Sequence, residues 1–174
     1  RLDGLRTVKY QVWDENGRLS NTCTTRNRRG LFVGINKYRN SNDLRGCVAD
    51  AQNISKAFAN YGDCNNNHFL LDSTATKQHI IEELTFLSGR VNPGDILLFF
   101  FSGHGLEGGY LVCHDSDSRE ESKIASSELA RLFVNFPRGL GLVCVLDACF
   151  STGMLPNGNF GQGFREDVSQ CMNE

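Results

Sequence analysis

Four short apolar runs alternate along the chain with segments in which apolar residues recur at helical spacing. The runs are continuous in their apolar character, which is typical of strands that are buried on both faces. They cover residues 30–36, 68–71, 96–101 and 141–146. Segments 42–61, 76–88 and 127–135 follow the first three runs and predict helices. This alternation predicts an α/β domain with a mostly parallel central sheet between two layers of helices, a three-layer α/β/α architecture.

Local signals refine the ends of the first helix and add a minor strand. Asn42 or Asp43 has the side chain of a helix N-cap, and Gly62 is a typical stop. We therefore expect the first helix to run from this Asn-Asp pair to about Tyr61. The short apolar segment 110–113 predicts a minor strand at an edge.

The two ends of the chain differ from this central part. Residues 1–28 begin with an alternating segment and an Asp-Glu-Asn-Gly turn, which predict a short hairpin followed by a polar linker. Residues 29–153 contain the strands and helices and form the expected domain. Residues 154–174 are rich in glycine and predict a flexible loop.

Composition and charge narrow the class of protein. The 174 residues carry a net charge of −2, so we expect neither nucleic acid nor an anionic membrane as a partner. No apolar run reaches the ~18–20 residues of a membrane helix, and the chain shows no signal-peptide pattern. The seven cysteines include no CxxC pair, which predicts free thiols over a zinc site or a disulfide framework. We therefore expect a cytoplasmic location.

A histidine and a cysteine follow two of the predicted strands. Run 96–101 leads into Ser-Gly-His104-Gly, and run 141–146 leads into Asp-Ala-Cys149. The carboxyl ends of parallel strands meet at one edge, where ligands bind, so we expect His104 and Cys149 to lie close together. A thiol beside an imidazole can be held as the nucleophilic thiolate, and the imidazole can protonate a leaving amine. The pair predicts a catalytic dyad.

Other residues around this dyad have competing interpretations. Glycines on both sides of His104 free the backbone there, so we expect the N–H groups of Gly105 and Cys149 to form an oxyanion hole. The alternative for a cysteine at a strand end is a core residue, which is what we expect of Cys144. His114, next to Asp115, is the rival base.

These sequences resemble the motifs of a known clan of peptidases. Residues 102–105 and 147–153 are similar to the His and Cys motifs of the caspase-like cysteine peptidases, and residues 44–51 resemble a third motif of that clan. The resemblance extends over about residues 29–153. It implies a caspase-like fold and a cysteine endopeptidase that acts on proteins or peptides. The alternative is a non-catalytic signalling domain that uses the same fold as a binding surface.

The details of the motifs favour the metacaspase and orthocaspase branch. Asp147 stands where animal caspases carry Gln, and the metacaspase helix motif Gly-Cys-x-x-Asp is matched by Gly46, Cys47 and Asp50. The resemblance implies that Cys47, Asp50 and Asp147 belong to an S1 pocket for Arg or Lys. Paired carboxylates suit a cationic side chain. The alternatives are a helix-capping role for Asp50 and an Asp-specific enzyme with Arg45 in the pocket.

Two departures from the family pattern concern calcium and the end of the domain. Many metacaspases bind activating calcium; Asp115 matches one ligand, but Ser126 and Ser127 stand where an Asp pair is usual. We therefore favour no cofactor, with Asp115 and Asp117 as the calcium candidates.

The family domain also continues past the cysteine into a small subunit, whose strands we expect to be missing from this chain. We therefore expect a small subunit from the same precursor as a partner. Arg165 is the basic residue of the glycine-rich loop and the expected site of self-cleavage.

Overall fold

A parallel sheet of four strands forms the centre of the protein. The computed structural model describes residues 12–13, 19–20, 27–59 and 67–149. The strand order is β4-β3-β5-β9, and every neighbouring pair is parallel. The strands are β3 (Arg28–Gly34), β4 (Asn67–Leu71), β5 (Ile96–Ser102) and β9 (Gly141–Asp147). The mostly parallel sheet predicted from the apolar runs is confirmed.

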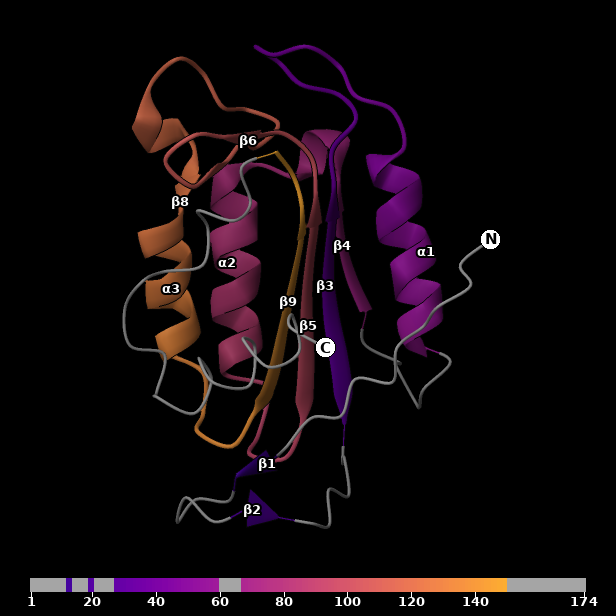
Figure 1. The fold of residues 1–174 in the computed structure, drawn as a ribbon, viewed down its shortest axis with the longest axis vertical. Helices are drawn as coiled ribbons and strands as arrows, with labels where there is room; N and C mark the ends of the chain where they lie inside the picture. The colour runs from indigo at the N-terminus through magenta and orange to yellow at the C-terminus, as the bar shows by residue number, and fades with distance from the viewer. Residues whose placement is uncertain (1–11, 14–18, 21–26, 60–66, 150–174) are drawn as a thin grey trace.

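Helices cover both faces of this sheet (Figure 1). The helix α1 (Cys47–Ala59) lies on one side, and α2 (Lys77–Ser88) lies with α3 (Ser126–Val134) on the other. The fold is therefore the three-layer α/β/α arrangement expected from the sequence. None of the helices in the described ranges has the length and apolar character needed to cross a membrane.

The side chains of β5 explain why its sequence is apolar throughout. Leu97, Phe99 and Phe101 pack into the larger core cluster with α2 and α3. Leu98 and Phe100 belong to a second cluster, on the face that α1 covers. Since burying one such side chain contributes about 1.5–3 kcal/mol, both faces contribute to the stability of the sheet. Because successive side chains of a strand point to opposite faces, Ser102, the last residue of β5, lies on the α1 side.

The start of α1 differs from the prediction. The helix begins at Cys47, so neither Asn42 nor Asp43 caps it. Asp43 instead accepts hydrogen bonds from the backbone N–H of Tyr38 and from the ammonium of Lys37. Gly46, with a φ of 104°, turns the chain into the helix, and its carbonyl accepts the first helical bond from the Asp50 N–H. A left-handed φ favours glycine, so the backbone, not a side-chain cap, sets this boundary.

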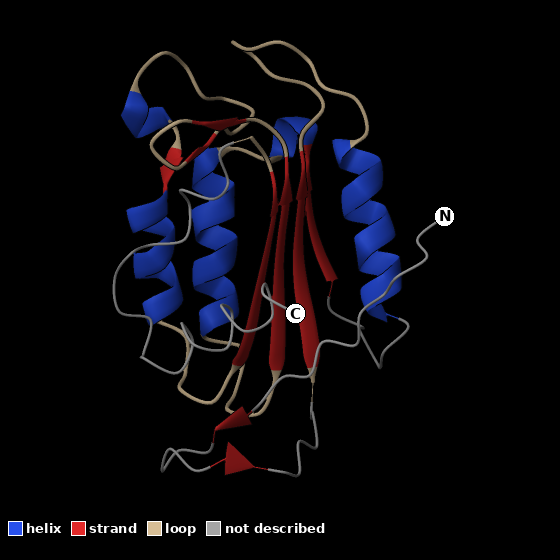
Figure 2. Ribbon diagram, in the orientation of Figure 1, coloured by secondary structure: helices blue, strands red, loops and turns tan. Residues whose placement is uncertain are grey.

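Small elements surround the central sheet. Short strands β6 (Gly105–Leu106), β7 (Tyr110–Leu111) and β8 (Ile124–Ala125) form an antiparallel sheet near the carboxyl ends of the central strands (Figure 2). Only β7 was anticipated, as part of segment 110–113. Towards the N-terminus, β1 (Val12–Trp13) pairs antiparallel with β2 (Leu19–Ser20). Two short 3-10 helices are η1 (Asp72–Thr74) and η2 (Glu120–Ser122). Tyr61, Gly62 and residues 154–174 lie outside the described residues.

Candidate active site

Three neighbouring strands end at the same level and are joined there by backbone hydrogen bonds. After β3, the N–H of Ile35 donates to the carbonyl of Ser102 at 3.0 Å. After β5, the N–H of Gly103 donates to the carbonyl of Asp147 at 3.2 Å. The segments that carry the candidate histidine and cysteine therefore leave the sheet side by side, as the strand order requires.

His104 is held on two sides by the loop that follows β3. Its backbone N–H donates to the hydroxyl of Tyr38 at 2.8 Å, and the two rings pack with their centroids 4.7 Å apart. Its Nε2 lies 2.8 Å from the carbonyl oxygen of Asn42. Burial raises the pKa of the Tyr38 hydroxyl far above its ordinary value, so this support stays neutral. The loop after β3 therefore holds both the backbone and the ring of the histidine.

The contact with Asn42 determines which ring nitrogen of His104 can act as a base. A carbonyl oxygen only accepts hydrogen bonds, so the proton of the neutral imidazole lies on Nε2. Nδ1 then keeps its lone pair. If Nδ1 takes up a second proton, the carbonyl of Asn42 stabilises the resulting cation.

Cys149 lies directly against Gly105, the residue after the histidine. A Cβ atom built on Gly105 would lie 2.1 Å from the carbonyl oxygen of Cys149 and 3.2 Å from the Cβ of Ala148. Any side chain at position 105 would therefore displace the cysteine backbone. The structure thus brings the backbone of Cys149 against Gly105, the residue after His104, and Cys149 is exposed.

Asp147, the last residue of β9, lies on the face of the sheet that α1 covers. Its register partner is Ser102, whose hydroxyl donates to the Asp147 carboxylate at 3.0 Å. Ser102 is 1% exposed, whereas Asp147 is exposed. A buried hydroxyl therefore holds one oxygen of a carboxylate that solvent can reach.

The two α1 residues proposed for the same pocket have different surroundings. Cys47 is 7% exposed, and its carbonyl lies 2.5 Å from where a Cβ on Gly34 would be. Asp50 is exposed, with its Oδ2 3.5 Å from the position of a Cβ on Gly46. Cys47 therefore helps to pack α1 against β3, while Asp50 presents a carboxylate at the start of the helix. The ends of β3 and β9 are two strand spacings apart, roughly 10 Å.

The other described cysteines are core residues. Cys113 is fully buried, and Cys144 is half-buried against the larger core cluster. Burial raises the pKa of each thiol to about 12. Neither is a thiolate near neutral pH, which leaves Cys149 as the exposed thiol of the described residues.

The rival base, His114, has a structural setting of its own. Its Nδ1 lies 2.7 Å from the carbonyl oxygen of Lys37. Its backbone N–H donates to Ala75, and its carbonyl accepts from Arg39. His114 therefore ties the loop after β3 to the segment before α2.

Two residues of this site were not identified from the sequence. Asn42 contributes a main-chain carbonyl, which any residue could provide, so its side chain carries no signal. Tyr38 contributes a hydroxyl and a ring from the loop after β3, and only its place behind a strand end could have drawn attention to it.

Comparisons with known proteins agree with this fold. A crystal structure of a Geobacter sulfurreducens protein aligns with a TM-score of 0.57 and 22% identity, over 71% of this chain and 50% of that one. This likeness concerns the fold alone. The family model of the metacaspase, peptidase C14 domain matches residues 28–157, and the chain belongs to this family.

Curated relatives support the same assignment. The chain is 33% identical to metacaspase-1A of Aspergillus oryzae over 77% of its length and 36% of the relative. It is 28% identical to metacaspase-1 of Schizosaccharomyces pombe over the same shares of the two chains, 77% and 36%. The chain thus spans about a third of the length of the curated relatives that it matches. The predicted resemblance to the metacaspase branch is confirmed.

Proposed function

We propose that this chain is the catalytic part of a cysteine endopeptidase that cuts protein or peptide substrates after Arg or Lys. Membership of the peptidase C14 family supports the reaction class. The single observation that carries the proposal is the close approach of the Cys149 carbonyl to Gly105, because it sets the backbone of the exposed cysteine against the residue that follows His104. Nδ1 of His104 is the base, since Nε2 is engaged by Asn42.

Each proposed step uses a group of this chain. Nδ1 of His104 accepts the thiol proton, and the thiolate of Cys149 attacks the scissile carbonyl carbon. The N–H groups of Gly105 and Cys149 stabilise the oxyanion. The imidazolium, stabilised by the Asn42 carbonyl, then protonates the departing amine, leaving an acyl-enzyme. Water, deprotonated by the same imidazole, releases the second product and restores the thiol.

The carboxylates of Asp50 and Asp147 form the proposed S1 pocket, with Cys47 packing the helix start beneath it. Both carboxylates are exposed and belong to the same face of the sheet. A guanidinium can bind a carboxylate through two parallel hydrogen bonds and keeps its charge at any relevant pH. The Ser102 hydroxyl orients the Asp147 carboxylate and leaves its other oxygen for the substrate.

The P1 preference is testable with a panel of fluorogenic peptides that differ only at that position. We expect Arg and Lys peptides to be cut and Asp peptides to be ignored. Asp147→Asn should remove a charge-assisted pair worth on the order of 2–3 kcal/mol, lowering kcat/KM for Arg peptides roughly 30- to 150-fold. Glu107→Gln, at an exposed position between β6 and β7, is the matched control and should change little. Faster turnover of Asp peptides would favour the alternative in which Arg45 reads the substrate.

The free edge of β9 and its exposed side chains suggest where a small subunit would join. Among the described residues, β9 is an edge strand of the central sheet. On its α1 side, Val143 is 43% and Val145 is 39% exposed. We propose that strands from the same precursor pair with this edge, and that a helix from it covers these side chains.

Self-cleavage after Arg165 completes the proposed function. It rests on the sequence, because Arg165 lies outside the described residues. A tethered site has a high effective concentration, so even a poor recognition sequence can be cut. Mass spectrometry of the full-length precursor should find cleavage after Arg165 in the wild type and none in Cys149→Ala. A fully active wild type with an intact Phe164–Glu166 segment would refute self-cleavage.

A further inference from the structure

The loop between β7 and β8 encloses a lysine. Lys123 is 6% exposed, and its ammonium donates to the backbone carbonyls of Asp117 at 2.8 Å and Arg119 at 2.7 Å. A lysine is rarely buried to this extent unless its charge is compensated. Carbonyl oxygens that converge on a charge provide that compensation, so the loop is arranged around a cation that belongs to the chain.

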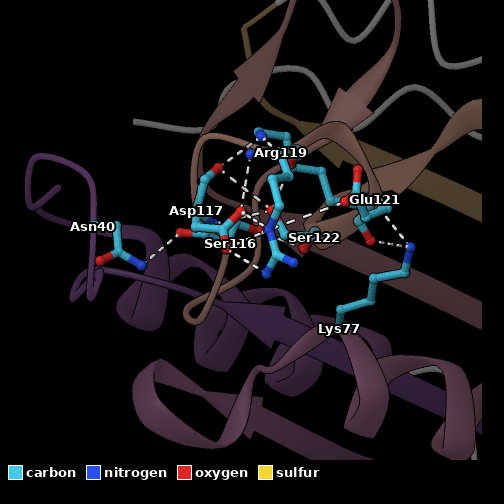
Figure 3. Close-up of polar contacts among 8 residues, drawn as sticks. Asn40, Lys77, Ser116, Asp117, Arg119, Glu121 and Ser122 are labelled. Carbon is cyan, nitrogen blue, oxygen red and sulfur yellow. Dashed lines mark hydrogen bonds and ion pairs between the residues drawn. The ribbon is translucent and has the colours of Figure 1, made fainter.

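A second lysine supports the same loop from outside. The ammonium of Lys77, on the first turn of α2, donates to the carbonyls of Glu121 at 2.9 Å and Lys123 at 2.8 Å. It also pairs with the Glu128 carboxylate at 2.7 Å. Figure 3 shows Lys77 and Asn40, which come from separate elements, pointing toward this loop. Four backbone carbonyls of the loop therefore face two ammonium groups.

The acidic candidates for a calcium site have other partners. The carboxylate of Asp115 accepts from the backbone N–H of Lys77, the first residue of α2, at 3.1 Å. The guanidinium of Arg119 binds Asp117 at 2.6 and 2.9 Å and holds the pKa of that carboxyl well below its usual range. Within the described ranges, no three His, Cys, Asp or Glu side chains gather as metal ligands would. The described residues of this loop do not fit a calcium ion, which prefers several charged oxygens.

We propose that Lys123, supported by Lys77, is a built-in cation that keeps residues 115–123 ordered, so that this loop needs no divalent metal. The inference goes beyond the proposed peptidase activity and does not depend on it. A metal ion would have to displace an ammonium that already satisfies these carbonyls. Repulsion between the metal and the two lysines adds to that cost.

The loop is tied to the segment after β3 that holds the candidate histidine. The amide of Asn40 donates to the carbonyl of Ser116 at 3.0 Å, and Asn40 lies two residues before Asn42, whose carbonyl contacts His104. An ordered loop therefore supports this segment whether or not calcium is present.

Hydrogen exchange of the full-length protein, followed by mass spectrometry, tests the proposal without relying on activity. In the wild type, backbone amides of residues 116–123 should exchange at the same rate in chelator and in millimolar calcium. In chelator, Lys123→Met should accelerate their exchange on the order of tenfold or more, because the carbonyls lose a charged donor. Lys56→Met, at an exposed position in the last turn of α1, is the matched control and should leave the loop unchanged.

A second variant covers the case in which Lys123→Met does not fold. Lys77→Met removes the outer ammonium, whose side chain is only partly buried, and should accelerate exchange in the same segment by a smaller factor. Slower exchange of the wild-type loop in calcium would overturn the proposal. A folded Lys123→Met whose loop exchanges at the wild-type rate would also overturn it. If Lys123→Met does not fold, the same result in Lys77→Met would overturn it.

Discussion

Cys149→Ala is expected to abolish peptide hydrolysis, with a loss of at least ~10⁴-fold in kcat for Arg peptides. Cys149 is the exposed cysteine whose backbone lies against Gly105, and the other described cysteines are buried or half-buried. Without the sulfur no acyl-enzyme forms, so the residual rate reflects only binding and polarisation of the substrate. Steady-state hydrolysis, with the folded state checked by thermal unfolding, gives the measurement.

Cys144→Ala is the matched control for this variant. Cys144 packs against the core three residues inside β9 from the strand end, so its loss should cost stability, about 1 kcal/mol, and leave the rate nearly unchanged. Alkylation at neutral pH should label Cys149 before Cys113 or Cys144, because burial raises the pKa of both core thiols to about 12. Retained turnover in Cys149→Ala would refute the mechanism and favour a non-catalytic binding domain.

The strand ends could be predicted from the sequence because a buried parallel sheet imposes a simple pattern. Every residue of β5 is buried, so the run 96–101 stands out against its polar neighbours, and the next residues must lie at the carboxyl edge. The positions of His104 and Cys149 follow from that single fact together with the strand order. The strands of two residues, β6 and β8, have no such periodicity, and their pairing depends on tertiary contacts.

Backbone groups and buried charges were harder to foresee. Asn42 acts through its carbonyl, and Asp43 resembles a helix cap but binds Tyr38 and Lys37 instead. Lys123 lies in a polar loop, and only the fold shows that it is enclosed. Side-chain type indicates what a residue can do, whereas these roles depend on which main-chain atoms face it.

Gly105 is needed for a reason other than the one expected from the sequence. The sequence suggested that glycine was needed there for backbone freedom. Gly105 is not among the described glycines with positive φ, so its conformation is open to other residues. What it provides is space, because a Cβ would meet the carbonyl of Cys149. The glycine is therefore needed for the close approach of the two strand ends.

His104→Ala is expected to lower kcat at least ~10²-fold, the usual scale for a general acid–base group. The same substitution should slow alkylation of Cys149 at neutral pH, because no imidazole remains to take the thiol proton. This second readout separates a lost base from a merely displaced substrate.

His114→Ala is the matched control. The ring of His114 bonds the Lys37 carbonyl, so its loss should lower the melting temperature and leave the alkylation rate of Cys149 near that of the wild type. An essential His114 beside a dispensable His104 would assign the base to His114 instead. The expected result, fast alkylation in His114→Ala and slow alkylation in His104→Ala, would show that the ring held by Asn42 activates the thiol.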